Sequence, residues 1–519
     1  MTMNAKRLLC AVTIMCAALE VDATDYYISP DGKDNANGLS EENALATMGA
    51  AQKKVKPGDA VYILPGTYMV KESEISKEEK SGPYKIIFDM SQKGTADKPI
   101  SFIGLTDADG KRPVFDLSEV KPAGYRVTAF LVSGQYLVFR NFEVTGIQVT
   151  ITGHTQSENF RITNGSHNTF ENIACHDGMG IGFYLTRNSS YNLFVNCDGY
   201  NNYDPVSDVS SKTGMGSGGN NDAFGCHVNK DNPGNIFIGC RAWNNSDDGY
   251  DLINCHSATV FAYSFAYKNG YDAENVSRGD GNGFKAGGYG MSGAKTLPEN
   301  GAPMHTVHHC IATGNKSNGI YSNHHIGGLH FHDNTSYKNN RYNYSLVNRK
   351  GAAEDEAVDV DGYGHVIERN MSVGTKHVTS LNGADGQNTI EDNSFTWKNN
   401  QWTNNSPAET AFESTDIADM KAPRETDGTL SEKTLRFLKL KEFPGYGCSM
   451  DGYKDAIADA KLTSGAEIKV ITGIEKIRRD NTDNSRQGMF YDLNGRKTNK
   501  DKNLKTFKKG RDGHTIIIR

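Results

Sequence analysis

A bulky apolar residue recurs through the middle of the chain at a nearly constant spacing. The steps between these anchors are 24, 43, 24, 46 and 24 residues, so the repeat is 24 residues long and two copies carry insertions of about 20. The anchors are Phe170, Phe194, Phe237, Phe261, Val307 and Phe331. Short apolar runs between Gly- and Asn-rich turns, with little helical periodicity, indicate strands. The pattern predicts an all-β chain wound as a parallel β-helix solenoid.

Polar positions keep the register of the anchors. Three residues past the last five anchors lies a column of mostly small or thiol side chains: Cys197, Cys240, Ser264, Cys310 and Asn334. Eight residues past the same five anchors every position is an asparagine: Asn202, Asn245, Asn269, Asn315 and Asn339. An amide donates and accepts hydrogen bonds, so stacked asparagines can satisfy the backbone of successive turns. We expect a structural asparagine ladder, and cysteines that pack in the core and form no disulfides.

The two ends of the chain differ from the repeat. Residues 26–68, with a short helix expected over 44–55, resemble the opening of right-handed parallel β-helix proteins, where a helix caps the first coil. Residues 416–440 are expected to close the solenoid. Residues 485–519 resemble the small C-terminal β module of exported Bacteroidetes proteins, which serves sorting in some of them. We therefore divide the chain into a signal peptide (1–23), a right-handed parallel β-helix solenoid (24–465) and a small C-terminal β module related to sorting (466–519).

Composition and charge narrow the function classes. Lys and Arg total 56 and Asp and Glu total 62, a net charge of −6 that does not favour nucleic acid as a partner. Lys6 and Arg7, followed by an apolar run over 8–19, predict a secretory signal cleaved near Ala18 or Ala23. That run is too short to span a membrane, and no longer one follows. We expect an exported monomer that is periplasmic, at the cell surface or secreted.

Four short segments share one shape: Asp or Asn, a small residue, a bulky apolar residue and a variable one. They are residues 221–225, 247–251, 282–285 and 318–321. When they are aligned on the bulky residue, the next column reads Gly225, Asp251, Lys285 and Tyr321. Neighbouring side chains of a strand point to opposite faces, and adjacent strands lie about 4.7–4.9 Å apart. If the bulky column enters the core, Asp251 and Lys285 are outward neighbours.

Further carboxylates gather beside that pair. Asp222, Asp247 and Asp248 precede the same strands, so four carboxylates and one amine share a small patch. Unpaired carboxylates repel each other, and a hard cation with oxygen ligands, usually Ca²⁺, relieves the repulsion. The alternative is a set of solvated turn aspartates beside an exposed lysine. Both insertions, residues 203–220 and 271–281, emerge next to the patch, which favours a binding face.

The motifs of this region resemble polysaccharide lyase family 9, roughly over residues 25–460. They are Asp-Asp-Gly-Tyr-Asp at 247–251, Asp222 upstream, Gly-Phe-Lys at 283–285 and Phe-Leu-Lys-Leu-Lys at 437–441. The resemblance implies a calcium-dependent lyase that cleaves pectin, an acidic plant cell-wall polysaccharide, by β-elimination at galacturonate. It also implies that Asp222, Asp247, Asp248 and Asp251 bind Ca²⁺ and that Lys285 is the catalytic base.

Two other function classes stay open at this point. One is a β-helix glycoside hydrolase with Asp247 and Asp248 as the acid and base of an inverting enzyme, although Gly-His-Gly and Arg-Ile-Lys segments are not evident. The other is a non-catalytic carbohydrate-binding solenoid, which needs no base beside a cation. The product separates the three: an unsaturated sugar, a plain reducing end, or none. Between homogalacturonan and rhamnogalacturonan I, the aromatic and polar loops favour rhamnogalacturonan I.

Overall fold

The computed structural model describes residues 23–80, 82–153, 155–207, 218–289, 301–374, 378–381, 388–390 and 409–464. All of these belong to one compact unit, Met1–Ile468. Most of the predicted signal peptide and the predicted C-terminal β module lie outside the described residues. Within the described part of the chain, no helix is both long enough and apolar enough to cross a bilayer.

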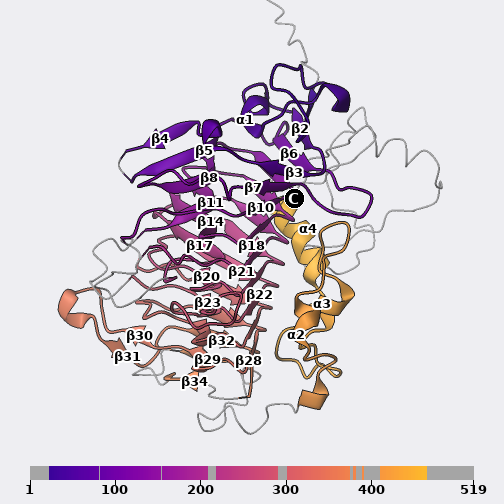
Figure 1. Cartoon of the computed structure of the whole chain (residues 1–519). Coiled ribbons are helices and arrows are strands. Elements are labelled where there is room, and N and C mark those ends of the chain that lie inside the picture. Colours follow the sequence, from indigo (N-terminus) through magenta and orange to yellow (C-terminus); the bar gives the residue numbers. More distant parts are fainter. Residues whose placement is uncertain are drawn as a thin grey trace, which may run out of the picture. The chain divides into compact units, whose positions relative to one another are not determined.

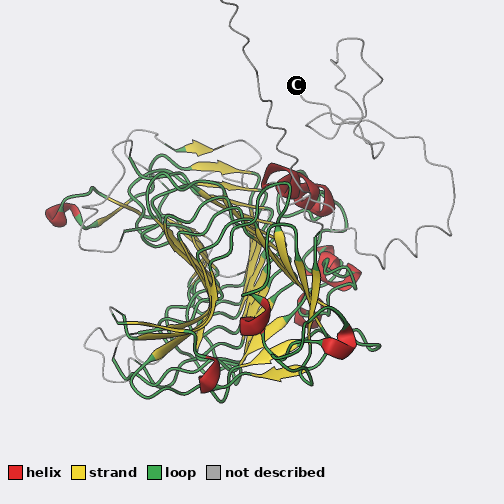
Figure 2. Cartoon of the chain, turned by 90° about the horizontal axis from the view of Figure 1, so that it is seen from above, coloured by secondary structure: helices red, strands yellow, loops and turns green. Residues whose placement is uncertain are grey.

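Three long sheets wind around a common axis, and each coil contributes one short strand to each sheet (Figures 1 and 2). The twelve-stranded sheet runs, in spatial order, β1 (Asp25–Ile28), β2 (Ala60–Ile63), β6 (Ile100–Gly104), β9 (Leu137–Arg140), β12 (Thr169–Glu171), β15 (Leu193–Val195), β18 (Asn235–Ile238), β21 (Thr259–Ala262), β24 (Thr306–His308), β27 (His330–His332), β32 (Val366–Glu368) and β35 (Thr389–Ile390). The ten-stranded sheet runs β3 (Thr67–Met69), β7 (Val114–Asp116), β10 (Glu143–Thr145), β13 (Ala174–His176), β16 (Asp198–Tyr200), β19 (Arg241–Trp243), β22 (Phe265–Tyr267), β25 (Ile311–Thr313), β28 (Thr335–Tyr337) and β33 (Met371–Val373). The eleven-stranded sheet runs β34 (Val378–Thr379), β29 (Tyr342–Ser345), β26 (Asn318–Tyr321), β23 (Phe284–Lys285), β20 (Tyr250–Asp251), β17 (Phe224–Val228), β14 (Gly180–Arg187), β11 (Ser157–Thr163), β8 (Arg126–Val132), β5 (Tyr84–Met90) and β4 (Lys77–Glu79).

Strand pairing in these sheets is parallel except at the edge pair β4 and β5, which is antiparallel. A separate antiparallel pair joins β30 (Asn348–Arg349) to β31 (Asp359–Val360). The predicted parallel β-helix is therefore confirmed, since consecutive coils add strands in parallel to each sheet.

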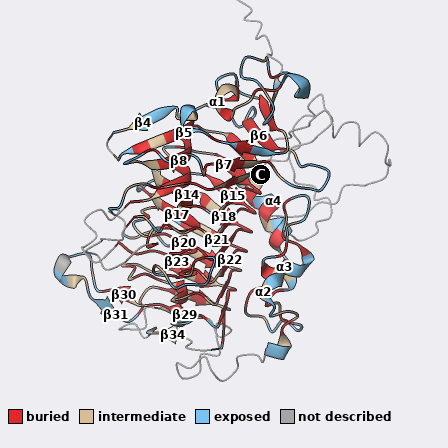
Figure 3. Ribbon diagram, viewed as in Figure 1, coloured by how far each residue is buried: buried red, intermediate tan, exposed pale blue. Residues whose placement is uncertain are grey.

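The anchors pair with one another in the predicted order along the twelve-stranded sheet. Phe170 pairs with Phe194, Phe194 with Phe237, and the register continues to Phe331. All are buried, and the rings of Phe170 and Phe194 stack at 4.6 Å with an interplanar angle of 3°. Buried residues recur along the strands of successive coils (Figure 3). A 24-residue step is thus the length of one coil, and the longer steps are coils with inserted loops.

The two polar columns lie where the register predicts. The asparagine ladder is continuous: Asn202 donates to Asn245, Asn245 to Asn269, Asn269 to Asn315 and Asn315 to Asn339, with Nδ2–Oδ1 distances of 2.9–3.1 Å. A second ladder, absent from the sequence analysis, joins Asn168, Asn192 and Asn235. The seven described cysteines are buried and free, so the prediction of cysteines packed without disulfides is confirmed for them.

The N-terminal helix is shorter than expected. Helix α1 covers only Met48–Ala51, because Leu45 still pairs with β1 and Thr47 caps the helix by accepting a hydrogen bond from the Ala50 amide. Asp34 holds Thr47 in place by accepting from its amide and hydroxyl, both at 2.9 Å. The helix thus begins four residues after its predicted start.

The C-terminal part of the β-helix unit does not close the end of the solenoid, contrary to the prediction for residues 416–440. Residues 409–464, called the strap below, run along the flank of the coils (Figure 1). They contain α2 (Ile417–Met420), α3 (Glu432–Arg436) and α4 (Tyr453–Ser464). Arg424 Nη2 lies 2.5 Å from Asp198 Oδ1, and Arg241 Nη1 donates to the Met420 and Ala422 carbonyls. Apolar strap residues, among them Leu438, cover the outer face of the coils because that face is itself apolar.

Candidate active site

The four segments predicted to share one shape pair in register at neighbouring strands of the eleven-stranded sheet. Phe224, Tyr250, Phe284 and Ile320 form one paired column, and all are buried. Their neighbours Gly225, Asp251, Lys285 and Tyr321 form the next column. In the last three segments the small residue is a glycine, and this allows the stacking: a Cβ at Gly249 would lie 2.7 Å from the Gly283 carbonyl oxygen, and one at Gly283 would lie 2.5 Å from that of Gly319.

Three of the predicted ligands form one carboxylate cluster just before β17 and β20. Asp222, Asp247 and Asp248 each offer a carboxylate oxygen, and these oxygens lie within 4.8 Å of one another. Asp222 Oδ1 accepts from the Asp248 amide at 3.0 Å, so the backbone of one coil positions the carboxylate of the previous one. Asp280 donates its amide to Asp247 Oδ1 at 2.7 Å. These bonds fix one oxygen of Asp222 and one of Asp247.

The fourth predicted ligand, Asp251, lies beside the lysine. Lys285 Nζ is 3.1 Å from Asp251 Oδ2 and 3.0 Å from Asp248 Oδ2, so the amine bridges Asp251 and the cluster. The other oxygen of Asp251 accepts from the Ile253 amide at 2.6 Å. All five predicted site residues thus meet, with Lys285 where the pairing of β20 and β23 places it.

The patch is outward-facing but not solvated, which departs from the surface position that the sequence suggested. The five residues are only 0–8% exposed, and Asp248 is fully buried. The covering comes from the inserted loops. The Gly279 amide donates to the Ser246 carbonyl at 2.7 Å, and Ser246 Oγ donates to the Gly218 carbonyl at 2.8 Å. Both insertions therefore lie against the turn that carries Asp247.

The two loops also contact each other. The Arg278 guanidinium lies over the Tyr203 ring, 4.2 Å from its centroid, and Asp272 accepts from Arg278 Nε at 2.8 Å. Lys316 from the next coil donates to the Arg278 carbonyl at 2.5 Å. The described parts of residues 203–220 and 271–281 therefore form one built wall beside the aspartates. Residues 208–217 lie outside the described residues.

Burial and mutual repulsion dominate the electrostatics. Burial, followed by the charges of Asp247, Asp251 and Asp248, raises the pKa of Asp222 well above its usual value. Burial and Asp248 do the same to the pKa of Asp247. Burial raises the pKa of Asp248 to about 6 although Lys285 lowers it. Burial lowers the pKa of Lys285, but the four carboxylates outweigh burial and raise it well above its usual value.

These residues fit a hard divalent cation. The donors are all carboxylate oxygens, the ligands that Ca²⁺ prefers, and two ligands on opposite sides of a Ca²⁺ ion at 2.3–2.6 Å stand roughly 4.6–5.2 Å apart. The oxygens of the cluster lie within 4.8 Å of one another, close enough to be bound to one such ion. Asp248 Oδ2 is buried and accepts no hydrogen bond of acceptable geometry, despite its short distance to Lys285. A buried carboxylate oxygen of this kind is costly unless it has another partner.

Sequence reasoning missed other polar groups next to the amine. Tyr321 pairs with Lys285, and its hydroxyl lies 2.6 Å from His324 Nε2, while His324 Nδ1 contacts Asp359. Burial raises the pKa of Tyr321. His227, two residues after Gly225, is partly buried, and its Nε2 is buried without a hydrogen bond. The aligned column contained Tyr321, but Asp359 comes from a separate hairpin strand that no repeat position indicates.

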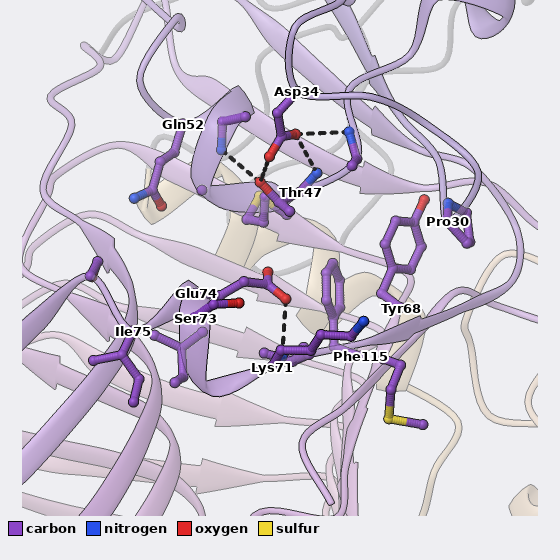
Figure 4. A pocket seen from close by; sticks show the side chains of 18 of the residues that line it. Pro30, Asp34, Thr47, Gln52, Tyr68, Lys71, Ser73, Glu74, Ile75 and Phe115 are labelled. Carbon is purple, nitrogen blue, oxygen red and sulfur yellow. Dashed lines mark hydrogen bonds between the residues drawn. The ribbon is translucent and has the colours of Figure 1, made fainter. Parts of the chain in front are cut away.

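A second hollow lies at the N-terminal end of the coil, far from this chemistry in sequence. It has a volume of about 950 Å³ and is lined by residues around α1 and β3, among them Thr47, Tyr68 and Glu74 (Figure 4). None of the five predicted site residues lines it. Its carboxylates serve the local fold, since Asp34 holds Thr47 and Glu74 accepts from the Lys71 amide. The aspartate cluster therefore remains the candidate active site.

Comparison with known proteins gives the same answer for fold and class. Residues 26–370 match the family described as Pel9A-like, right handed beta helix region. The chain belongs to the Pel9A-like right-handed β-helix family. Pectate lyase L of Dickeya dadantii (strain 3937) is 33% identical over 419 residues, which cover 79% of this chain and 82% of the relative.

Solved structures of Pel9A-like proteins align over most of this chain. One named rhamnogalacturonan lyase has a TM-score of 0.75 and 40% identity, covering 82% of this chain and all of the other. The pectate lyase Pel9A has a TM-score of 0.59 and 30% identity, covering 81% of this chain and 90% of its own. The predicted family, right-handed fold and polysaccharide lyase class are thereby confirmed.

Proposed function

We propose that this polysaccharide lyase, which acts on pectic polymers, cleaves at galacturonate by β-elimination with Lys285 as the base and a Ca²⁺ ion held by Asp222, Asp247, Asp248 and Asp251. One observation carries the proposal: β20 and β23 pair so that Lys285 Nζ lies 3.0 and 3.1 Å from two carboxylates of the acidic cluster. An amine held at the edge of a cation site is placed to take the proton from C5, the carbon that bears the substrate carboxylate bound at that site.

The chemistry follows from the substrate. Lys285 Nζ takes the proton from C5, the C5–H electrons form the C4–C5 double bond, and the C4–O4 bond breaks, with the departing oxygen protonated by water. That proton is weakly acidic because C5 bears a carboxylate. A cation bound by the aspartates would supply positive charge that neutralises this carboxylate and stabilises the charge developing on it. The wall of residues 203–207 and 271–281 limits water around the reacting groups.

Lys285 must be neutral to accept a proton. An ordinary lysine has a pKa of about 10.4, and the carboxylates of this site raise that of Lys285 further. A cation on the aspartates removes this effect, because a nearby positive charge disfavours the ammonium form. We therefore expect activity to need the metal and to rise towards alkaline pH.

The alternatives fit less well. An inverting hydrolase holds its two carboxyl groups roughly 6.5–9.5 Å apart to admit a water, whereas the carboxylate oxygens of Asp247 and Asp248 lie within 4.8 Å. A binding-only solenoid gives no reason for an amine between two buried carboxylates. For the polymer we propose rhamnogalacturonan I, supported by the 40% identical structure of that name and by the aromatic, charged wall formed by Tyr203 and Arg278.

The decisive experiment compares Lys285→Ala and Lys285→Arg with the wild-type enzyme. A positioned base contributes about 10²–10⁴-fold to the rate, and arginine does not deprotonate at ordinary pH, so both variants should lose that much formation of unsaturated product. Substrate binding should persist in both. Lys268→Arg, on a neighbouring coil, is the matched control and should keep full activity. An active Lys285→Arg enzyme would reject the base assignment.

Two further measurements complete the test. The wild-type enzyme, stripped of metal on a chelating resin, should lose activity and regain it with Ca²⁺; full activity of the stripped enzyme would exclude the metal. Cleavage of rhamnogalacturonan I and homogalacturonan at equal galacturonate concentration assigns the polymer. Export, the monomeric state, the three-part division of the chain and the C-terminal β module remain proposals from the sequence.

A further inference from the structure

A group of imidazoles lies on the twelve-stranded sheet, whereas the aspartates belong to the eleven-stranded sheet. His308 ends β24 and His332 ends β27, and the two residues pair across these strands. Their rings stack at 4.7 Å with an interplanar angle of 3°. His309 follows His308 directly. One ring nitrogen from each of the three lies within 4.8 Å of those of the other two.

The backbone explains why consecutive histidines face the same place. Adjacent side chains of a strand point to opposite faces, but His309 has a φ of 51°, in the left-handed region. The chain turns a corner there, and the side chain of His309 comes round to meet that of His308. Tyr263, Asp333 and Arg369 occupy the same corner in other coils, with φ values of 50°, 56° and 50°.

The nitrogen geometry fits a tetrahedral transition-metal ion. His308 Nδ1 and His309 Nδ1 are 3.0 Å apart, and the two rings are nearly perpendicular. Two nitrogens bound to one Zn²⁺ at about 2.0–2.1 Å in tetrahedral geometry stand roughly 3.3 Å apart. Without metal the two nitrogens share a proton in a hydrogen bond. If that proton moves to Nε2 of the ring that carries it, the Nδ1 lone pairs of both His308 and His309 become free to bind a metal, and no proton is released.

The surroundings of the third imidazole are those of a metal ligand. His332 Nδ1 lies 2.8 Å from Asp333 Oδ2, and Arg369 Nε donates to the other oxygen of Asp333 at 2.8 Å. Metal-binding histidines commonly donate one ring N–H to a carboxylate, which leaves the other nitrogen for the ion. Because His332 stacks flat on His308, its ring must turn to aim that nitrogen, and its side chain is 19% exposed.

One more group supports binding of a metal at this corner. His330, whose ring lies 4.6 Å from that of His332, is a further imidazole beside the group, with Glu368 Oε2 3.5 Å from its Nε2. Neutral imidazole is a preferred ligand of Zn²⁺, Ni²⁺ and Cu²⁺.

We propose that His308, His309 and His332 form a structural site for a divalent transition-metal ion such as Zn²⁺, with Asp333 orienting His332. The ion would join two consecutive coils at the corner where the strap docks, since Cys448 Sγ donates to the His309 carbonyl at 3.1 Å. This site is independent of the proposed catalysis. It binds through nitrogen, whereas the aspartate cluster binds through oxygen.

The test is titration of the untagged, full-length, Ca²⁺-saturated protein with Zn²⁺ alone, followed by calorimetry and by the thermal unfolding midpoint. We expect one Zn²⁺ per chain and a rise in the midpoint. His309→Gln and His332→Gln should each weaken binding at least 100-fold and abolish the rise. Asp333→Asn, which removes only the orienting carboxylate, should weaken binding about 10–100-fold.

His167→Gln is the matched control, because His167 also stacks in an aromatic column, between Tyr136 and Tyr191, at 4.7 and 4.9 Å. It should bind Zn²⁺ as the wild type does. Co²⁺ gives a second readout, since tetrahedral Co²⁺ has strong visible absorption that the His332→Gln protein should lack. No binding by the wild-type protein, or binding that His309→Gln and His332→Gln leave unchanged, would overturn the proposal.

Discussion

Removing the cation should make the stability of this protein fall as the pH rises. Burial gives Asp248 a pKa of about 6 in the folded chain, against 3.8 in the unfolded chain. A carboxyl group with a raised pKa contributes its full stability below the unfolded value and loses it as the pH rises through the folded value. For Asp248 the loss therefore runs from about pH 4 to somewhat above pH 6. The pKa values of Asp222 and Asp247 are raised further, so their loss extends to higher pH.

The magnitude follows from the size of the shift. One pKa unit corresponds to about 1.36 kcal/mol, so a shift from 3.8 to about 6 gives about 3 kcal/mol from Asp248 alone. A bound cation removes this loss because it stabilises the ionised carboxylates. The loaded protein is stabilised in total by about 4 kcal/mol when the cation concentration is 1,000 times the dissociation constant at that pH, and this constant falls as the carboxyl groups lose their protons. The stability gap between loaded and metal-free protein should therefore widen between pH 4.5 and 8.

The assay is urea unfolding of resin-stripped and Ca²⁺-saturated protein across that range. Chelators in solution are avoided because their own affinity changes with pH. Carboxylates with lowered pKa values, such as those of Asp198 and Asp333, titrate below this window and do not interfere. Asp248→Asn, which cannot ionise, should remove about 3 kcal/mol of the decline in the metal-free protein. Parallel pH profiles for stripped and saturated wild-type protein would refute the reasoning.

Two further predictions concern the frame that carries the site. Asn269 is buried and its side chain makes four hydrogen bonds, to the Ala242 carbonyl, to Asn315 and to the amide and side chain of Asn245. Asn269→Ala should therefore lower the free energy of unfolding, measured in urea, by about 2–4 kcal/mol. The control Asn340→Ala, at an exposed position, should lower it by under about 0.5 kcal/mol, and equal effects of the two substitutions would contradict the ladder. Arg424→Met removes one of the two guanidinium groups bound to Asp198, so it should lower the free energy of unfolding by about 1–3 kcal/mol and make the strap sensitive to limited proteolysis. The control Arg436→Met, at a side chain that is 58% exposed, should change neither property. A strap that resists proteolysis in the Arg424→Met protein would show that apolar contacts alone hold it.

The periodic part of the molecule could be predicted from the sequence because equivalent positions of stacked coils carry similar residues. Phe170 and Phe194 occupy the same place in successive coils, so their spacing gives the length of a coil. Asp251 and Lys285 lie side by side for the same reason, although 34 residues separate them. Because the sequence repeats, a contact between distant residues can be predicted from their equivalent positions in two repeats.

Features without repetition could not be predicted. Burial of the aspartates depends on the Gly279 and Gly218 backbones of two inserted loops, and no column contains these residues. The strap was mistaken for an end cap because its partners, such as Asp198 for Arg424, are 226 residues away and follow no period. The imidazole group was missed because the left-handed backbone at His309, which joins the columns, leaves little trace in the sequence.

The strap has a consequence for how the molecule comes apart. A solenoid whose coils touch only their neighbours can open from either end, one coil after another, like a zipper. Here Lys461 of the strap contacts Glu171, and Glu409 contacts Lys338, so the strap is fastened at both ends to coils that are far apart in the stack. Because the strap links the two attachments, fraying of the coils at one end strains the attachment at the other end. The coils between the two attachments should therefore unfold together in one step. The strap thus makes unfolding of the stack cooperative and protects both ends against pulling and against proteolysis.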